Sequence, residues 1–162
     1  MLSLEGLVTH SQNRGFSVIQ FTNQDIVQNT QARLPLETLV LTLARERISA
    51  EDLRLLEDLN NSIVGALSSG DVLGSARADL QFHTVIVENT GNPWVESAMK
   101  RLLVPYFTFS MLYREFTPGL TQELMLKQHE LYIDYLKRNT SESAEQCVRF
   151  HFSLYSRFEQ TP

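Results

Sequence analysis

Residues 71–93 read DVLGSARADLQFHTVIVENTGNP and contain the start, the body and the end of one helix. Asp71 is a favourable N-cap residue, and apolar side chains follow it at helical spacing. Gly91, Asn92 and Pro93 then supply a C-terminal glycine, an N-cap asparagine and a first-turn proline. This stretch therefore predicts two consecutive helices joined by a short turn.

Similar start and stop signals recur along the chain after residue 22. Ser49-Ala50-Glu51-Asp52 resembles a capping box, and Thr117-Pro118-Gly119 breaks a helical pattern. Pro35 removes a backbone hydrogen bond, so we expect a kink or a restart there. The first predicted helix runs from Asn23 or Asp25 to about Arg47, and the second begins at the Ser49 box and stops at Ser69-Gly70-Asp71, which caps the third. The fourth follows Gly91-Asn92-Pro93 and runs to about Tyr113. The fifth runs from the break at Thr117-Pro118-Gly119 to about Arg138, and the sixth from near Ser141 to near Phe158. Short connections between them predict an all-α fold, an antiparallel bundle of six helices.

The first 22 residues have a different pattern. Leu7-Val8-Thr9 and the run from Phe16 to Phe21 are short β-type segments. The intervening residues, 10–15, have the composition of a turn. We therefore expect a β-hairpin before the bundle, although a hairpin alone is only marginally stable.

Composition restricts the class of protein. Of the 162 residues, 43% are hydrophobic and 20% are charged, as in an ordinary globular domain. The single cysteine, Cys147, excludes an intrachain disulfide framework. No leader and no long apolar run is present, so we expect a cytoplasmic protein without a membrane-spanning segment. The net charge of −5 argues against nucleic-acid binding over the whole surface.

Four side chains form a candidate metal site. Asp79 and His83 are separated by four positions, which places them on one face of a helix. His129 and His151 lie on either side of a predicted turn near Asn139. At about 1.5 Å of rise per residue, each is roughly 16 Å from that turn, so they should lie side by side on antiparallel helices.

An alternative is that each imidazole is an ordinary core residue satisfied by a backbone carbonyl. Burying three imidazoles and a carboxylate together costs several kcal/mol unless they share a partner, and a divalent cation satisfies all four. This ligand set suits zinc, nickel, manganese or iron better than calcium or magnesium. An ion with open positions would attract a carboxylate, or could acidify a bound water.

The order of these motifs resembles a known family. Arg33-x-x-x-Glu37, Asp79-x-x-x-His83, Gly91-Asn92-Pro93, His129 and His151 together are similar to the FCD effector-binding domain of FadR-type regulators in the GntR family. Six helices favour the VanR-like branch. Residues 4–8 and 14–18 resemble the end of the recognition helix and the wing of a winged helix-turn-helix. The resemblance divides the chain into a winged-domain remnant at 1–22 and an effector- and metal-binding domain at 25–160.

The resemblance also implies roles for particular residues. Asp79, His83, His129 and His151 would ligate the metal, Arg33 would meet an acidic effector, and Arg14 would contact DNA from the wing. Arg101, Arg114 and His10 are expected to be surface residues. A homodimer is implied, with operator DNA bound only by a full-length protein, because most of the winged domain is absent from this sequence.

Three functions follow as hypotheses. The first is a sensor, not an enzyme, that binds a metal and a small carboxylate effector to modulate operator binding. The second is a small metal-dependent hydrolase or lyase that uses the same Asp and His residues. No glutamate stands in a His-Glu-x-x-His arrangement to act as a general base, which weakens the second. The third is a dimerising bundle with a purely structural metal.

Overall fold

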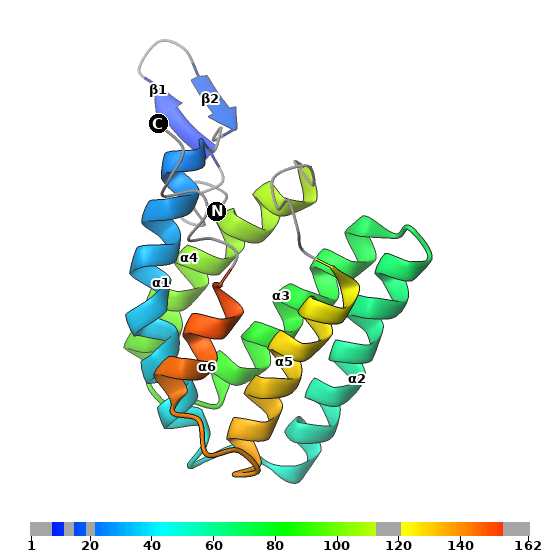
Figure 1. Cartoon of the computed structure of the whole chain (residues 1–162). Helices are drawn as coiled ribbons and strands as arrows, with labels where there is room; N and C mark the ends of the chain where they lie inside the picture. The colour runs from blue at the N-terminus through cyan, green and yellow to red at the C-terminus, as the bar shows by residue number, and fades with distance from the viewer. Residues whose placement is uncertain (1–7, 12–14, 19–21, 113–120, 154–162) are drawn as a thin grey trace.

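Six helices form the body of the protein, as the sequence predicts (Figure 1). The computed structural model describes residues 8–11, 15–18, 22–112 and 121–153. The helices are α1 (Asn23–Ala44), α2 (Ala50–Ser68), α3 (Val72–Glu88), α4 (Pro93–Leu112), α5 (Gln122–Leu136) and α6 (Ala144–His151). None of the described helices is long and apolar enough to cross a membrane.

The predicted caps begin the helices where the sequence places them. The hydroxyl of Ser49 accepts a hydrogen bond from the Asp52 N–H at 3.0 Å, and the carboxylate of Asp71 accepts one from the Gly74 N–H at 2.8 Å. These side chains satisfy amide groups that have no partner within the first turn of a helix. The start of α2 and the start of α3 are therefore local properties of the sequence.

The turn between α3 and α4 also forms as predicted. Gly91 has a φ of 62°, a conformation that glycine adopts without steric cost. The side-chain oxygen of Asn92 then accepts hydrogen bonds from the N–H groups of Trp94 and Val95. Pro93 occupies the first position of α4, where no amide hydrogen is needed.

Several predicted boundaries are wrong. Helix α1 continues through Pro35 without a restart, as α4 continues through Pro105, and α1 ends at Ala44. Helix α6 is only eight residues long: it begins at Ala144, after the Ser143 N-cap, and ends at His151 instead of near residue 158. Thr117-Pro118-Gly119 lies outside the described residues.

A short antiparallel hairpin precedes the bundle. Strands β1 (Val8–Ser11) and β2 (Gly15–Val18) pair with Val8 opposite Val18 and Ser11 opposite Gly15. Two four-residue strands do not by themselves support the assignment of this hairpin to a winged helix-turn-helix. That assignment remains a prediction.

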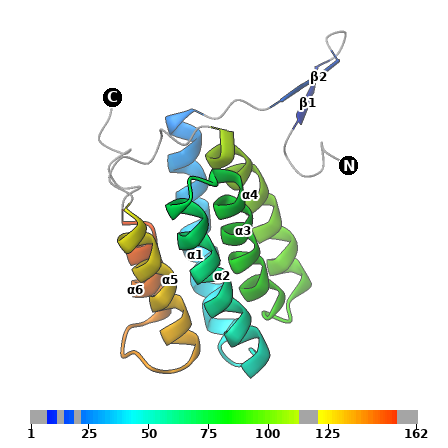
Figure 2. The ribbon, with the colours of Figure 1, turned by 90° about the vertical axis from the view of Figure 1, so that its right-hand side faces the viewer.

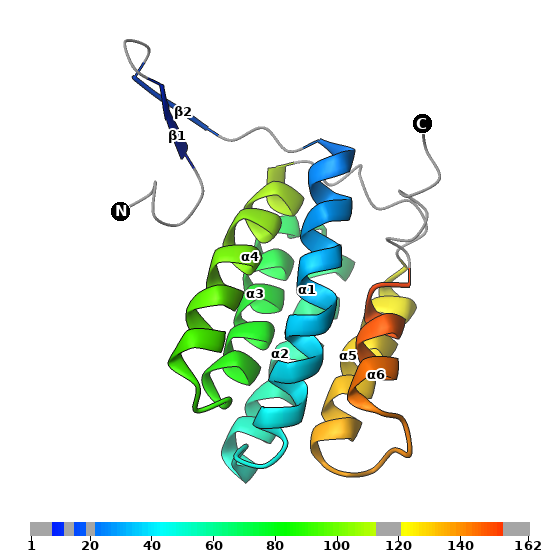
Figure 3. The same ribbon diagram turned by 90° about the vertical axis from the view of Figure 1, so that its left-hand side faces the viewer.

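The helices form a closed ring around one core. Each helix of the ring packs against the next in the order α1, α4, α3, α2, α5 and α6, and α6 packs against α1. Figure 2 shows α2 and α3 side by side, and Figure 3 shows α1 beside α4 and α5 beside α6. Side chains from all parts of this ring are almost fully buried, among them Leu41, Leu56, Phe82, Met99 and Leu103. Polar side chains on the inner faces of α1, α3, α5 and α6 interrupt this apolar core.

Candidate metal centre

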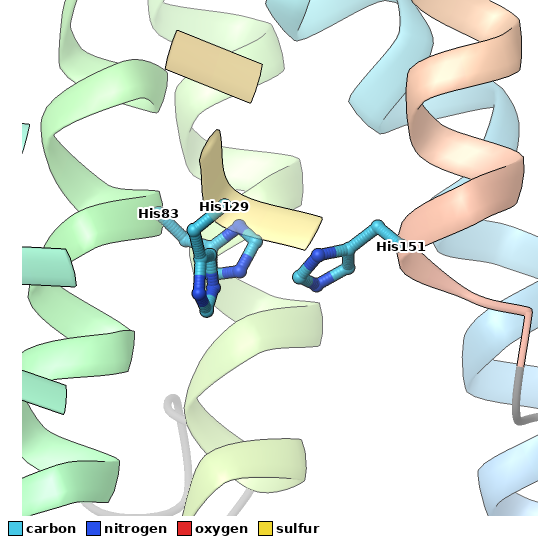
Figure 4. A group of neighbouring side chains, drawn as sticks. All are labelled: His83, His129 and His151. Atoms are coloured by element: carbon cyan, nitrogen blue, oxygen red, sulfur yellow. The ribbon is translucent and has the colours of Figure 1, made fainter. Parts of the chain in front are cut away.

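Three histidines from three helices meet in the interior of the bundle. His83 lies on α3, His129 on α5, and His151 is the last residue of α6. Figure 4 shows their rings pointing toward one another. One nitrogen from each ring lies within 4.8 Å of the others, a spacing that one metal ion can bridge.

Asp79 joins this group from the turn of α3 that precedes His83. Its Oδ1 lies 3.2 Å from Nε2 of His129 and 3.4 Å from Nε2 of His83. The structure therefore brings the three predicted histidine ligands together and places the fourth, Asp79, against two of them.

Five atoms of this cluster are buried and have no hydrogen-bond partner among the described residues. They are Oδ1 of Asp79, Nε2 of His83, both ring nitrogens of His129 and Nδ1 of His151. Each buried polar atom without a partner costs about 1–3 kcal/mol. A divalent cation accepts lone pairs from all four side chains at once, so the residues present fit such an ion.

The protonation states also suit a metal. Burial lowers the pKa of His151 well below its ordinary value, so this imidazole is neutral. For Asp79, burial alone would raise the pKa, but the adjacent His129 and His83 outweigh it and hold the pKa well below its ordinary value. A neutral imidazole and an ionised carboxylate are the forms that ligate metals.

Arg33 lies next to the cluster and not on the surface. Its side chain is 1% exposed and its guanidinium carbon lies 4.6 Å from the ring centre of Tyr106 and 4.9 Å from that of Phe152. Nη2 pairs with Oε1 of Glu37 at 2.7 Å. Nε and Nη1 are buried and have no partner within the part of the chain that the structure describes, so this arginine retains two groups that can donate to an anion.

Glu37 connects this arginine to the histidine cluster. Its Oε1 lies 3.4 Å from Nδ1 of His83, and its Oε2 accepts a hydrogen bond from the Tyr132 hydroxyl at 3.3 Å. Burial and the neighbouring Glu37 raise the pKa of Tyr132, so the phenol keeps its proton. Sequence reasoning gave Glu37 no role, although its position four residues after Arg33 indicated an ion pair.

A small cavity lies beside this connection. Glu37, His83 and Tyr132 line it together with apolar side chains that include Val40 and Met99. It has room for about one water molecule, so binding of an organic effector beside the cluster would require the surrounding side chains to move.

Comparison with known families agrees with this architecture. Residues 28–154, which include all of the side chains discussed above, match the family described as the FCD domain. The chain belongs to the FCD domain family. FCD domains are the effector-binding domains of GntR-family transcription regulators.

Individual proteins are similar to this FCD domain over nearly all of its length. The HTH-type transcriptional regulator YdhC of Bacillus subtilis is 24% identical over 154 residues, which cover 94% of this chain and 68% of that protein. Among solved structures, E. coli McbR/YncC is similar with a TM-score of 0.80 at 19% identity, over 98% of this chain and 80% of that one. A GntR protein from Rhodococcus sp. RHA1 has a TM-score of 0.74 at 18% identity, over 99% and 76% of the two chains.

The remaining candidate residues of this FCD domain take no part in the cluster. Arg101 is exposed on α4, as expected of a surface residue. His10 belongs to strand β1. Arg14 and Arg114 lie outside the described residues, so the predicted DNA contact of Arg14 remains a prediction.

Proposed function

We propose that this FCD domain binds a divalent metal ion through Asp79, His83, His129 and His151, and a small organic acid beside that ion. The observation that carries the proposal is the group of buried, unpartnered ligand atoms contributed by three helices. Nitrogen donors outnumber oxygen donors, which favours zinc, nickel, manganese or iron. When bound, such an ion would supply a positive centre for a carboxylate.

Charge supports an acid as the effector. Three neutral imidazoles and one carboxylate leave a divalent ion with a formal charge of about +1. Because Glu37 already offsets the charge of Arg33, the attraction for an anion would come mainly from the ion. The two unpartnered nitrogens of Arg33 would then orient the acid through hydrogen bonds.

The domain would act within a dimer on DNA. In a full-length regulator the acid would change the spacing of paired DNA-binding domains on two operator half-sites.

The outer face of α1 supports self-association because its exposed side chains, over four turns, carry no charge. These are Gln28, Gln31, Ala32, Pro35, Leu39 and Thr42. Two copies of such a face can meet without repulsion between like charges.

A hydrolase or lyase would need a general base beside the ion. Among the described residues, the carboxylate that lies next to the four candidate ligands is that of Glu37. Its two oxygens already accept hydrogen bonds from Arg33 and Tyr132. No observation therefore favours turnover over sensing.

Heating metal-loaded protein with a panel of small carboxylic acids tests this proposal. We expect one class of acid to raise the melting temperature without being consumed, and only when metal is present. Consumption of the acid would indicate an enzyme. A metal that binds without any response to acids would indicate a structural ion and would contradict the sensor.

A further inference from the structure

We infer that Glu37 is a positioning residue that fixes the proton of His83 on Nδ1 and so directs Nε2 to the metal. This inference rests on the proposed metal site and adds a residue from α1 to it. The ligands themselves come from α3, α5 and α6, so Glu37 would connect the metal to a fourth helix.

The His83 ring lies between two carboxylates. Nδ1 is 3.4 Å from Oε1 of Glu37, and Nε2 is 3.4 Å from Oδ1 of Asp79. A neutral imidazole carries one proton, and only the nitrogen without it can ligate a metal. A proton on Nδ1 faces an acceptor in Glu37 and leaves the lone pair of Nε2 for a metal ion beside Asp79. Without a metal, Asp79 is an equally near acceptor for a proton on Nε2, so of the two carboxylates it is Glu37 that favours the tautomer a metal requires.

Glu37 is itself held in place. Its side chain is 3% exposed, its Oε1 accepts from Arg33 at 2.7 Å and its Oε2 accepts from Tyr132 at 3.3 Å. A carboxylate oxygen has two lone pairs, so Oε1 can accept from Arg33 and His83 together. Because α1 and α5 each supply one of these donors, the orientation of the carboxylate is fixed from two sides.

The other two clustered histidines differ from His83. Nδ1 of His129 and Nδ1 of His151 are buried and have no partner in the part of the chain that the structure describes. Asp79 lies beside His129, but at Nε2 and not at Nδ1, so among the described residues neither ring has a carboxylate against its Nδ1 as His83 has. This contrast singles out His83 as the ligand whose orientation depends on a second residue.

The first experiment measures the tautomer directly in the unaltered protein. Two-bond 15N–1H correlations of the zinc-loaded protein at pH 8 should show the His83 proton on Nδ1 and zinc on Nε2. Zinc on Nδ1 with the proton on Nε2 would overturn the inference. Zinc content is measured on the same sample, so failure of the metal site and failure of the Glu37 role are distinguishable.

A second experiment compares two substitutions. Loss of a residue that orients a metal ligand lowers metal affinity by about 10–100-fold, and we expect this for Glu37→Ala. Glu37→Gln keeps an oxygen that accepts from Nδ1, so it should stay within a few-fold of the unaltered protein and keep the tautomer. Equal loss in both variants would show that the charge matters and not the orientation, which would contradict the inference.

The matched control is Glu46→Gln, which removes an exposed carboxylate that pairs with Arg138 at 2.8 Å. It should leave zinc affinity and the His83 tautomer unchanged. If Glu37→Ala does not fold, the double variant Arg33→Met/Glu37→Leu removes both buried charges and allows the same zinc titration. Unchanged affinity in that variant would also overturn the role of Glu37.

Discussion

Oδ1 of Asp79, on α3, lies 3.2 Å from Nε2 of His129, on α5, although α2 separates these two helices in the ring. The contact therefore crosses the interior of the bundle. A metal ion at this point would connect α3 to α5, which otherwise pack mainly on their neighbours in the ring. Binding or loss of the ion would therefore act on helices from different sides of the domain.

Metal removal should lower stability. At a free concentration 100 times its dissociation constant, a ligand that binds only the folded state adds about 2.7 kcal/mol. We expect the melting temperature to fall on treatment with a chelator and to recover when zinc, nickel or manganese is added. Calorimetry checks this, with calcium as the control cation. An unchanged melting temperature would contradict a metal site in the core.

Acidification should destabilise the metal-free protein. In the unfolded chain His151 takes up a proton near pH 6.5, whereas burial in the folded chain lowers its pKa well below that value. Unfolding therefore takes up a proton below pH 6.5, and stability falls with pH by up to about 1.4 kcal/mol per pH unit. Below about pH 4 the lowered pKa of Asp79 adds a loss of the same sign.

Urea unfolding of metal-free protein between pH 8 and pH 5 measures this effect. His151→Gln, which cannot take up the proton, should give a flatter profile than the unaltered protein. Identical profiles would show that His151 does not carry the dependence.

The buried pair of Arg33 and Glu37 predicts an asymmetric response to substitution. Arg33→Met leaves the Glu37 carboxylate buried without its partner, which costs about 3–5 kcal/mol. Replacing both residues with apolar ones, as in Arg33→Met/Glu37→Leu, should recover most of that loss. Urea unfolding provides the comparison. A double variant no more stable than the single one would show that the pair is not a coupled unit.

The uncharged face of α1 predicts where a dimer forms. Leu39→Glu places a charge on that face, and in a symmetric dimer the two new charges would repel each other. Analytical ultracentrifugation should show a shift toward monomer. Leu55→Glu is the matched control, because Leu55 is a similarly exposed leucine on α2, 37% against 42% for Leu39. An equal effect of both substitutions would argue against the α1 face.

Sequence alone predicts those parts of the fold that depend on local chemistry. Ser49 and Asp71 form caps with residues three positions away, so their roles do not depend on the rest of the chain. The approach of His129 and His151 follows from the geometry of a helical hairpin, since both lie at similar distances from the turn. Arg138, with a φ of 65°, occupies the left-handed position of that turn without being a glycine.

Contacts between helices explain what sequence could not predict. The approach of Glu37 to His83 depends on how α1 packs against α3, which no local pattern determines. The stacking of Arg33 on Tyr106 and Phe152 likewise brings α1, α4 and the end of α6 together. The end of α6 at His151 was also missed, because helical spacing continues beyond the point where the helix stops.

The central claim is that Asp79, His83, His129 and His151 hold one divalent ion, and metal analysis of purified protein tests it most directly. We expect about one equivalent of zinc, nickel, manganese or iron in the unaltered protein after dialysis, and in His10→Ala, which changes the histidine outside the cluster. The double variant Asp79→Ala/His83→Ala should contain none. Full metal retention by that double variant would contradict the claim.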